Sequence, residues 1–253
     1  MTDFYPHVYL SPHLDDAVLS CGGLIHRQVV AGQRPLVITL FAGHPPAEEL
    51  SAFVQSLHAR WGDPVNVVAT RRAEDQAALA VLGADYLRLD YPDCIYRGRG
   101  HTGELYYTSS EALFGPVHPA DAGLPAELAT TLTELIPPGD GVTLYAPLTV
   151  GNHVDHRLTH AAARILSRQG WRVRFYEDYP YVEAEGALTA ALAARGIGHW
   201  QPATVLLDED DLAAKIRAIA CYPSQLKGLF GSAEAMPGRV RSYVAQVGGE
   251  RVG

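Results

Sequence analysis

The sequence predicts an α/β fold with a mainly parallel sheet that is covered by helices on both faces. Segments with strand character alternate with segments whose apolar residues recur at helical spacing along most of the 253 residues. The segment PLVITLFAG, at 35–43, is a continuous apolar run rich in β-branched residues, as expected for a strand buried on both faces. Together these observations favour βαβ units within a single domain that spans residues 1–253.

The first half of the chain opens with the strand HVYLS, which is followed by a helix with apolar residues at helical spacing. Two helices come after the buried strand. Gly83 is a suitable C-cap for the second of them, because glycine readily adopts the left-handed backbone that ends many helices. The expected elements are strands at 7–11, 35–43 and 85–91, and helices at 17–31, 46–61 and 69–83.

The second half continues the alternation after a polar segment, 94–121, that is rich in glycine and tyrosine and has little periodicity. The first helix after this segment ends in Pro-Pro-Gly, a strong stop signal. The expected elements are strands at 141–148, 171–179 and 203–207, and helices at 123–136, 153–169, 187–195 and 209–220.

Composition excludes several functional classes. Hydrophobic residues make up 47% and charged residues 19% of the chain, which is ordinary for a folded globular protein. The net charge of −8 and the lack of a basic stripe argue against a nucleic-acid partner. No apolar run approaches the roughly 18 residues of a membrane span, and no signal peptide is evident. Three widely spaced cysteines indicate reduced thiols, so we expect a cytoplasmic protein.

Two polar clusters follow predicted strands directly. PHLDD, at 12–16, comes after the first strand, and TVGNHVDHRLTH, at 149–160, comes after the strand at 141–148. Ligands of open α/β sheets bind beyond the carboxyl ends of the strands. Although the clusters are about 140 residues apart, we therefore expect them to share one edge of the sheet.

The second cluster places several histidines near the start of a helix. Asn152 is a suitable N-cap, which would put His153 and His156 in the first turn. With His160 they lie within roughly 60° of one another on the helix, away from its apolar face. A solvated histidine face is the alternative to a functional one.

The two clusters together can supply a catalytic zinc site. Such a site uses three protein ligands with nitrogen or oxygen donors and leaves one position open for water. His13, Asp16 and His156 provide two imidazoles and one carboxylate. His160 is a rival for the third ligand, and the alternative for the whole PHLDD turn is a helix cap.

The remaining side chains of the two clusters suit acid–base chemistry. Asp15 would take the proton from metal-activated water. His153 would polarise a carbonyl group or protonate a leaving amine. Asp155 would fix the tautomer of a histidine.

Five segments in order resemble the PIG-L/LmbE-like zinc-dependent N-acetyl-sugar deacetylases. SPHLDD with the following CGG resembles the first motif of that family, and HVDH resembles the second. RRAEDQAALAVLG (71–83), LDYPD (89–93) and CYPSQL (221–226) resemble its other segments. Leu14 and Val154 replace the prolines of the two motifs, and Ala17 replaces an acidic residue that is common in relatives.

The resemblance implies a Rossmann-like three-layer α/β/α fold and removal of an acetyl group from an N-acetylglucosamine-type amino sugar, with release of acetate. It implies Zn²⁺ as cofactor, although the same ligands also suit Fe²⁺. The implied metal ligands are His13, Asp16 and His156. The implied catalytic residues are the base Asp15 and a second group, His153, that is oriented by Asp155. Arg71 and Asp93 match positions that contact substrate in relatives.

The segment 94–121 has no general family counterpart and is the expected substrate-binding loop. Aromatic rings such as that of Tyr96 suit stacking on a sugar, and guanidinium groups such as that of Arg97 suit its hydroxyls. An ordinary surface loop is the alternative. For the whole protein, the alternatives are hydrolysis of another small amide and a non-catalytic, metal-bearing, sugar-binding protein. A homo-oligomer is compatible with the sequence.

Overall fold

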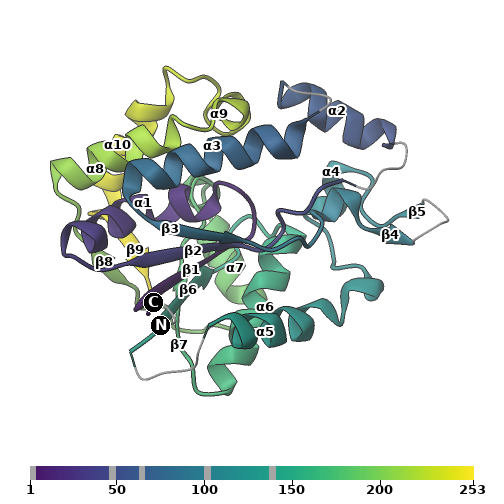
Figure 1. Ribbon diagram of the computed structural model, residues 1–253, viewed down its shortest axis with the longest axis horizontal. Helices are drawn as coiled ribbons and strands as arrows, with labels where there is room; N and C mark the ends of the chain where they lie inside the picture. Colours follow the sequence, from purple (N-terminus) through teal and green to yellow (C-terminus); the bar gives the residue numbers. More distant parts are fainter. Residues whose placement is uncertain (1–3, 46–49, 63–65, 100–103, 137–140) are drawn as a thin grey trace.

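A seven-stranded sheet forms the centre of the structure (Figure 1). The computed structural model of the chain describes residues 4–45, 50–62, 66–99, 104–136 and 141–253. Adjacent strands from β3 to β7 pair in parallel, whereas β9 pairs antiparallel with both β7 and β8. In sheet order the strands are β3 (Asp85–Arg88), β2 (Pro35–Thr39), β1 (His7–Ser11), β6 (Thr143–Pro147), β7 (Arg172–Tyr176), β9 (Glu250–Val252) and β8 (Ala203–Val205).

Helices cover both faces of the sheet, which confirms the predicted three-layer α/β/α fold. Successive side chains of a strand point to opposite faces, so Tyr9 packs in one apolar core while Val8 and Leu10 pack in the other. The Tyr9 face is covered by α1 (Asp16–Val30), α3 (Val67–Leu82), α8 (Glu209–Ile219), α9 (Pro223–Phe230) and α10 (Met236–Val247). The opposite face is covered by α5 (Leu124–Leu135) and α6 (Val154–Arg168) (Figure 1).

The expected strands at 35–43 and 85–91 are too long. Parallel pairing of β1 with β2 ends at Ser11 and Thr39, and β3 ends at Arg88. Beyond this point the chain leaves the ladder, and a single bridge between Phe41 and Asp90 remains. The residues at 40–43 are nevertheless buried. An apolar run thus indicated burial correctly but overstated the length of the strand.

The C-terminal part of the chain contains three elements that the sequence did not predict: α9, α10 and β9. Proline occupies the first turn of α9 and of α10, as is common at helix starts, but both helices also contain glycine. Strand β9 has only three residues, too few for a periodic signal. It runs antiparallel at the end of the parallel set.

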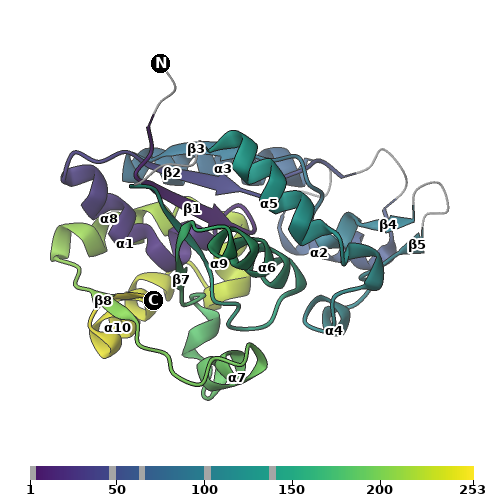
Figure 2. The same ribbon diagram turned by 90° about the horizontal axis from the view of Figure 1, so that it is seen from below.

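The connections beyond the carboxyl ends of the strands build one end of the molecule. They carry α2 (Ala52–Arg60), α4 (Ser110–Leu113) and the short strands β4 (Gly98–Arg99) and β5 (Glu104–Leu105). Figures 1 and 2 show these elements at the end toward which β1 and β2 point. The first residues of the helix expected at 46–61 lie outside the described residues, as do residues 100–103 of the segment 94–121. The remaining helices are α7 (Ala187–Ala194) and the short helices η1 (Cys94–Tyr96), η3 (Pro119–Asp121) and η4 (Tyr181–Glu183). Within the described residues, none of the helices has the length and apolar content to span a membrane.

A buried ion pair joins the last strand to two helices. Lys215 Nζ, on α8, lies 2.6 Å from Glu250 Oε1, on β9, and both side chains are almost fully buried. The Glu250 carboxylate also accepts hydrogen bonds from the backbone N–H groups of Gly23 (3.0 Å) and Leu24 (2.7 Å) in α1. The buried charge is therefore paired and hydrogen-bonded, which a buried carboxylate requires.

We predict that Lys215→Met destabilises the protein by about 3–5 kcal/mol, because it leaves the Glu250 charge buried and unpaired. The double variant Lys215→Met/Glu250→Gln should regain part of the loss, since a neutral amide oxygen can still accept one of the two backbone hydrogen bonds. Urea unfolding measures both values. If Lys215→Met lowered the free energy of unfolding by less than about 1 kcal/mol, the Lys215–Glu250 pair would not be needed for stability.

Candidate active site

The two polar clusters meet at the carboxyl ends of β1 and β6, which are neighbours in the sheet. The first cluster joins β1 to α1, and the second joins β6 to α6. The strand order reverses here, because β2 and β3 lie on one side of β1 and β6 and β7 lie on the other. Such a reversal is where ligands bind in open α/β sheets, and the expected shared edge is observed.

The three predicted metal ligands converge at this edge. Asp16 Oδ2 lies 3.2 Å from His13 Nδ1 and 3.3 Å from His156 Nε2. In a tetrahedral zinc site with bonds of about 2.0–2.1 Å, neighbouring ligand atoms stand about 3.3 Å apart, so the spacing fits such an ion. Burial disfavours a charged carboxylate, but His156 and His13 hold the pKa of Asp16 well below its usual value. Asp16 therefore offers an anionic ligand.

His153 is close enough to be considered as a ligand instead of Asp16. Ring nitrogens of His13, His153 and His156 all lie within 4.8 Å of one another. However, His153 Nδ1 accepts a hydrogen bond from the backbone N–H of Asp155 (3.3 Å), so the neutral ring carries its proton on Nε2. A metal ligand must present an unprotonated nitrogen. The tautomer therefore favours Asp16 in the ligand set.

A carboxylate contacts each of the two candidate ligand histidines on the ring nitrogen that faces away from Asp16. Asp155 Oδ2 lies 3.0 Å from His13 Nε2, and Asp178 Oδ1 lies 2.7 Å from His156 Nδ1. Such contacts fix the ring and its tautomer, so that the other nitrogen faces the metal position. The Asp155 carboxylate thus contacts His13, whereas the resemblance implied that it orients His153. It is the backbone N–H of Asp155 that contacts His153.

Asp15 lies beside the ligands and does not cap α1 with its side chain. It occupies the N-cap position, but its carboxylate makes no capping hydrogen bond. Arg71 Nη2 lies 3.6 Å from Asp15 Oδ2. Burial and the charge of Asp16 raise the pKa of Asp15 to about 6, against the opposing charge of Arg71. The helix-cap alternative for this turn is therefore not supported by its side-chain contacts.

His153, and not Asn152 as predicted, is the N-cap of α6. Asn152 has a left-handed backbone (φ 67°), as do Thr149 (φ 74°) and Gly151 (φ 88°). A left-handed backbone is unfavourable for residues other than glycine, such as Thr149 and Asn152, and such residues cluster at functional sites. Arg195 holds this turn through hydrogen bonds to Thr149 Oγ1 and Asn152 Oδ1. The left-handed turn at 149–152 moves the N-cap from Asn152 to His153, and the spacing of residues in the sequence does not reveal such a turn.

The histidines of α6 are not a solvated face. His153, His156 and His160 are all buried, because the connections beyond the strands cover them. His160 Nδ1 donates to the backbone oxygen of Pro147 (2.9 Å), and its ring packs against Phe175. His160 is therefore a poor candidate for the third ligand.

A cavity of about 120 Å³ opens onto the cluster. Arg71 and Asp93, the two residues expected to contact substrate, both line it. Tyr96 lines a smaller adjoining cavity, and its hydroxyl lies 2.6 Å from His58 Nε2. The rest of the wall is mainly apolar, with Gln225, from the segment CYPSQL, and two aromatic residues that sequence reasoning did not single out, Trp61 and Tyr181.

Arg97 does not lie where a substrate-binding residue was expected. Its guanidinium is buried, with Nη2 2.7 Å from Asp155 Oδ1 and Nε 3.0 Å from Asp121 Oδ2. Arg97 and His13 hold the pKa of Asp155 well below its usual value in spite of burial. Arg97 thus supports the carboxylate behind His13. Side-chain type suggested a sugar contact, but the tertiary structure directs the group inward.

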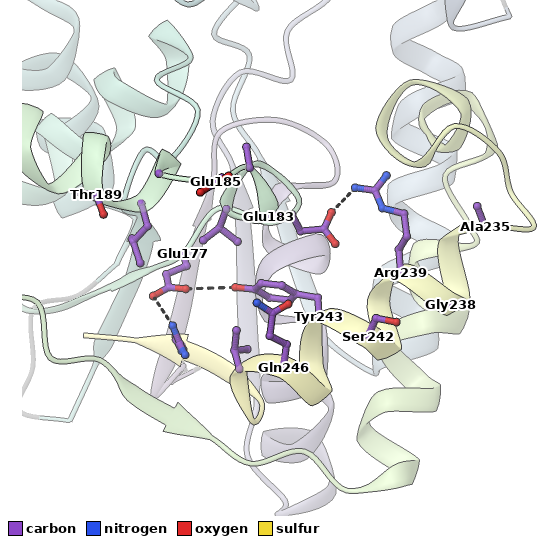
Figure 3. Close-up of a pocket in the computed structure, with 16 residues that line it drawn as sticks. Glu177, Glu183, Glu185, Thr189, Ala235, Gly238, Arg239, Ser242, Tyr243 and Gln246 are labelled. Atoms are coloured by element: carbon purple, nitrogen blue, oxygen red, sulfur yellow. Dashed lines mark hydrogen bonds and ion pairs between the residues drawn. The ribbon is translucent and has the colours of Figure 1, made fainter.

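A larger cavity of about 760 Å³ lies on the other side of η4, between α7 and α10 (Figure 3). Among its lining residues, Arg239 pairs with Glu183, and Tyr243 donates a hydrogen bond to Glu177. None of the predicted catalytic residues lines it. The chemistry of the side chains, and not cavity size, therefore locates the candidate active site in the smaller cavity.

The chain belongs to the PIG-L family: residues 8–167 match the family model described as GlcNAc-PI de-N-acetylase. It is accordingly a hydrolase of the N-deacetylase class. It is 29% identical over 239 residues to the 2'-N-acetylparomamine deacetylase of Niallia circulans, covering 88% of this chain and 82% of that protein. It is 31% identical over 227 residues to the protein of the same name from Streptomyces fradiae, covering 85% and 72%.

A solved structure of a deacetylase is also similar. The zinc-inhibited form of teicoplanin deacetylase superposes with a TM-score of 0.79 at 26% identity, covering 97% of this chain and 96% of that one. The similarity therefore extends beyond the segment matched by the family model. Coverage of 97% of the chain means that it includes most of the C-terminal part beyond residue 167.

We predict that Asp178→Asn weakens binding of Zn²⁺ by 10–100-fold, because the ring of His156 loses the charged partner that fixes its tautomer. Competition with a chromogenic chelator measures the affinity. The matched control is Glu177→Gln, which changes the neighbouring carboxylate that contacts Trp200 and Tyr243. Equal affinity of Asp178→Asn and wild type would show that Asp178 does not hold the ligand.

His160 should make the stability of the fold depend on pH. Burial lowers its pKa to about 4 from an ordinary value of 6.5. Unfolding therefore takes up a proton between these values, so stability is lost as the pH falls from about 6.5 to about 4, by at most about 3 kcal/mol. His160→Asn keeps a donor for Pro147 and removes the titration. Urea unfolding across this range should give a shallower pH slope for the variant, and identical slopes would contradict the assignment.

Proposed function

We propose that this protein hydrolyses the acetamide of an N-acetylglucosamine-type sugar within a larger glycoside and releases acetate. A divalent metal, Zn²⁺ or Fe²⁺, is the proposed cofactor. The observation that carries the proposal is the convergence of His13, Asp16 and His156, with Asp15 beside them in a cavity. Two imidazoles and one carboxylate form a donor set that suits either ion.

The proposed roles of the cofactor and the base follow from this arrangement. When bound, the metal activates water and polarises the amide carbonyl. Asp15 accepts a proton from the attacking water as the carbon–oxygen bond forms. Asp15 then returns that proton to the amide nitrogen, so that the C–N bond breaks and acetate and a free amine result. The carboxyl group thus serves first as base and then as acid.

His153 is proposed to donate a hydrogen bond and not a proton. Its neutral ring carries hydrogen on Nε2, because Nδ1 accepts from the backbone of α6. Burial lowers its pKa to about 3, so the ring stays neutral near pH 7. A neutral N–H group can stabilise negative charge that develops on the carbonyl oxygen. These observations support polarisation of the carbonyl group over protonation of the leaving amine, the two roles that the sequence left open.

The small cavity and the relatives suggest the substrate class. A volume of about 120 Å³ is well below the 300–1,000 Å³ of pockets that enclose a drug-sized ligand. We infer that the cavity takes the acetamido group and part of its sugar, while the rest of the glycoside extends outside. Relatives are named for N-acetylparomamine and teicoplanin, which supports an acetylated amino sugar of a secondary metabolite.

We predict that Asp15→Asn lowers kcat for acetate release by roughly 10²–10⁴-fold while metal content stays near one per chain, because the amide cannot accept the proton. Acetate is measured with a panel of N-acetylglucosamine glycosides, including N-acetylated aminoglycosides. Asp210→Asn, a change of an exposed carboxylate, is the matched control. Removal of the metal by a chelator should abolish release, and addition of Zn²⁺ or Fe²⁺ should restore it.

Two outcomes would contradict the proposal. A metal-loaded wild-type protein that binds these glycosides without releasing acetate would favour the non-catalytic sugar-binding alternative. Release from simple amides but from no amino sugar would favour hydrolysis of another small amide.

A further inference from the structure

Tyr181 occupies space above the turn that leads into α6. It is the first residue of η4, on the connection that follows β7. A Cβ atom placed on Gly151 would lie 2.7 Å from Tyr181 Cγ and 2.9 Å from its Cδ1. Only a glycine leaves room for the ring, and Gly151 also has a left-handed backbone (φ 88°). Because Gly151 has no side chain, the ring of Tyr181, from a different segment, can pack against the turn two residues before His153.

The Tyr181 ring is fixed against two aromatic neighbours of the site. It stands edge-on to His156, with ring centroids 6.0 Å apart and an interplanar angle of 89°. It also contacts Phe114, with centroids 6.4 Å apart, and Phe114 in turn lies 5.4 Å from the ring of His153. Behind it, η4 is held by the Glu183–Arg239 ion pair in the larger cavity (Figure 3). Tyr181 therefore belongs to a packed wall between the two cavities.

The hydroxyl of Tyr181 is available to a substrate. Tyr181 lines the same cavity as Asp15 and His153 and is its one hydroxyl-bearing residue in the described part of the chain. Arg71 Nη2 lies 3.6 Å from Asp15 Oδ2, Arg71 Nε is buried without a hydrogen-bond partner among the described residues, and Gln225 Nε2 donates to Ser224 Oγ. The described residues provide no hydrogen-bond partner for the Tyr181 hydroxyl. With its ordinary pKa of about 10, a tyrosine hydroxyl is a hydrogen-bond donor at neutral pH.

We propose that the Tyr181 hydroxyl, together with His153, donates a hydrogen bond to the acetamide oxygen as negative charge develops on it. The inference rests on the proposed deacetylase function and adds a catalytic residue to it. Preorganised donors aimed at the oxyanion contribute strongly to acyl-transfer catalysis, and the loss of one commonly costs 10²–10³-fold in kcat. No proton moves to or from Tyr181 in this role.

The test is Tyr181→Phe, which removes only the hydroxyl. We expect kcat for acetate release to fall by about 10²-fold, while KM stays within about threefold of wild type, because the donor acts mainly in the transition state. Metal content and the melting temperature should match those of wild type. Tyr243→Phe removes a hydroxyl in the larger cavity, where it donates to Glu177, and should leave kcat unchanged.

Gly151→Ala provides a second measurement. The new methyl group should push the Tyr181 ring out of position and lower kcat in the wild-type background. In the Tyr181→Phe background the same change should add little, because the hydroxyl is already absent. Equal losses in both backgrounds would mean that Gly151→Ala acts through backbone strain, against the inference.

Two further outcomes would distinguish failure of the role proposed for Tyr181 from failure of the proposed deacetylase function. A Tyr181→Phe enzyme with wild-type kcat, or with a raised KM alone, would overturn the catalytic role of Tyr181 and leave the proposed function standing. No acetate release by metal-loaded wild-type protein would overturn the proposed function, and this inference with it.

Discussion

The parallel pairing of β1 with β6 is the constraint on which the rest of the site depends. The pairing places the ends of two strands side by side, and the chain leaves both strands with polar residues that would be costly to bury alone. His13 and Asp16 come from one connection and His156 from the other. Their approach to about 3.2–3.3 Å follows from the spacing of adjacent strands and from the helices that begin there.

Buried charge at this edge is arranged in pairs that extend outward from the ligands. His156 is backed by Asp178, which also accepts from the backbone N–H of Val150 (2.8 Å). His13 is backed by Asp155, which is in turn held by Arg97. Each group compensates the desolvation of the next, which a half-satisfied network could not do. The apolar cores on both sides of the sheet keep this network rigid.

The two cavities differ in the residues that line them. In the larger cavity Arg239 is paired with Glu183, and Tyr243 donates a hydrogen bond to Glu177. The smaller cavity is lined by Asp15 and by Tyr181, the proposed base and the proposed hydrogen-bond donor. The segment η4 lies between the two cavities, because Val182 and Glu183 line the larger one and Tyr181 lines the smaller one. Contacts of η4 in the larger cavity therefore help to position Tyr181 in the smaller one.

The sequence by itself determined the α/β class, the order of most elements and the two clusters that meet. Periodicity and burial are local properties, so apolar runs such as 35–43 are informative without a structure. The candidate metal ligands and Asp15 could be named because they belong to two polar clusters that follow predicted strands, where parallel topology brings side chains together. Family motifs then reduced the remaining choices.

Only the tertiary structure decided which partners these residues have. Arg97 turns inward to Asp155, the carboxylate of Asp155 meets His13, and Asp178 holds His156. These contacts join segments that are up to 142 residues apart. Tyr181 enters the site because Gly151, on a different strand connection, leaves room for its ring. Such contacts depend on side-chain direction and on three-dimensional packing. No repeating pattern in the sequence indicates either of these. They could therefore be found only once the chain was folded.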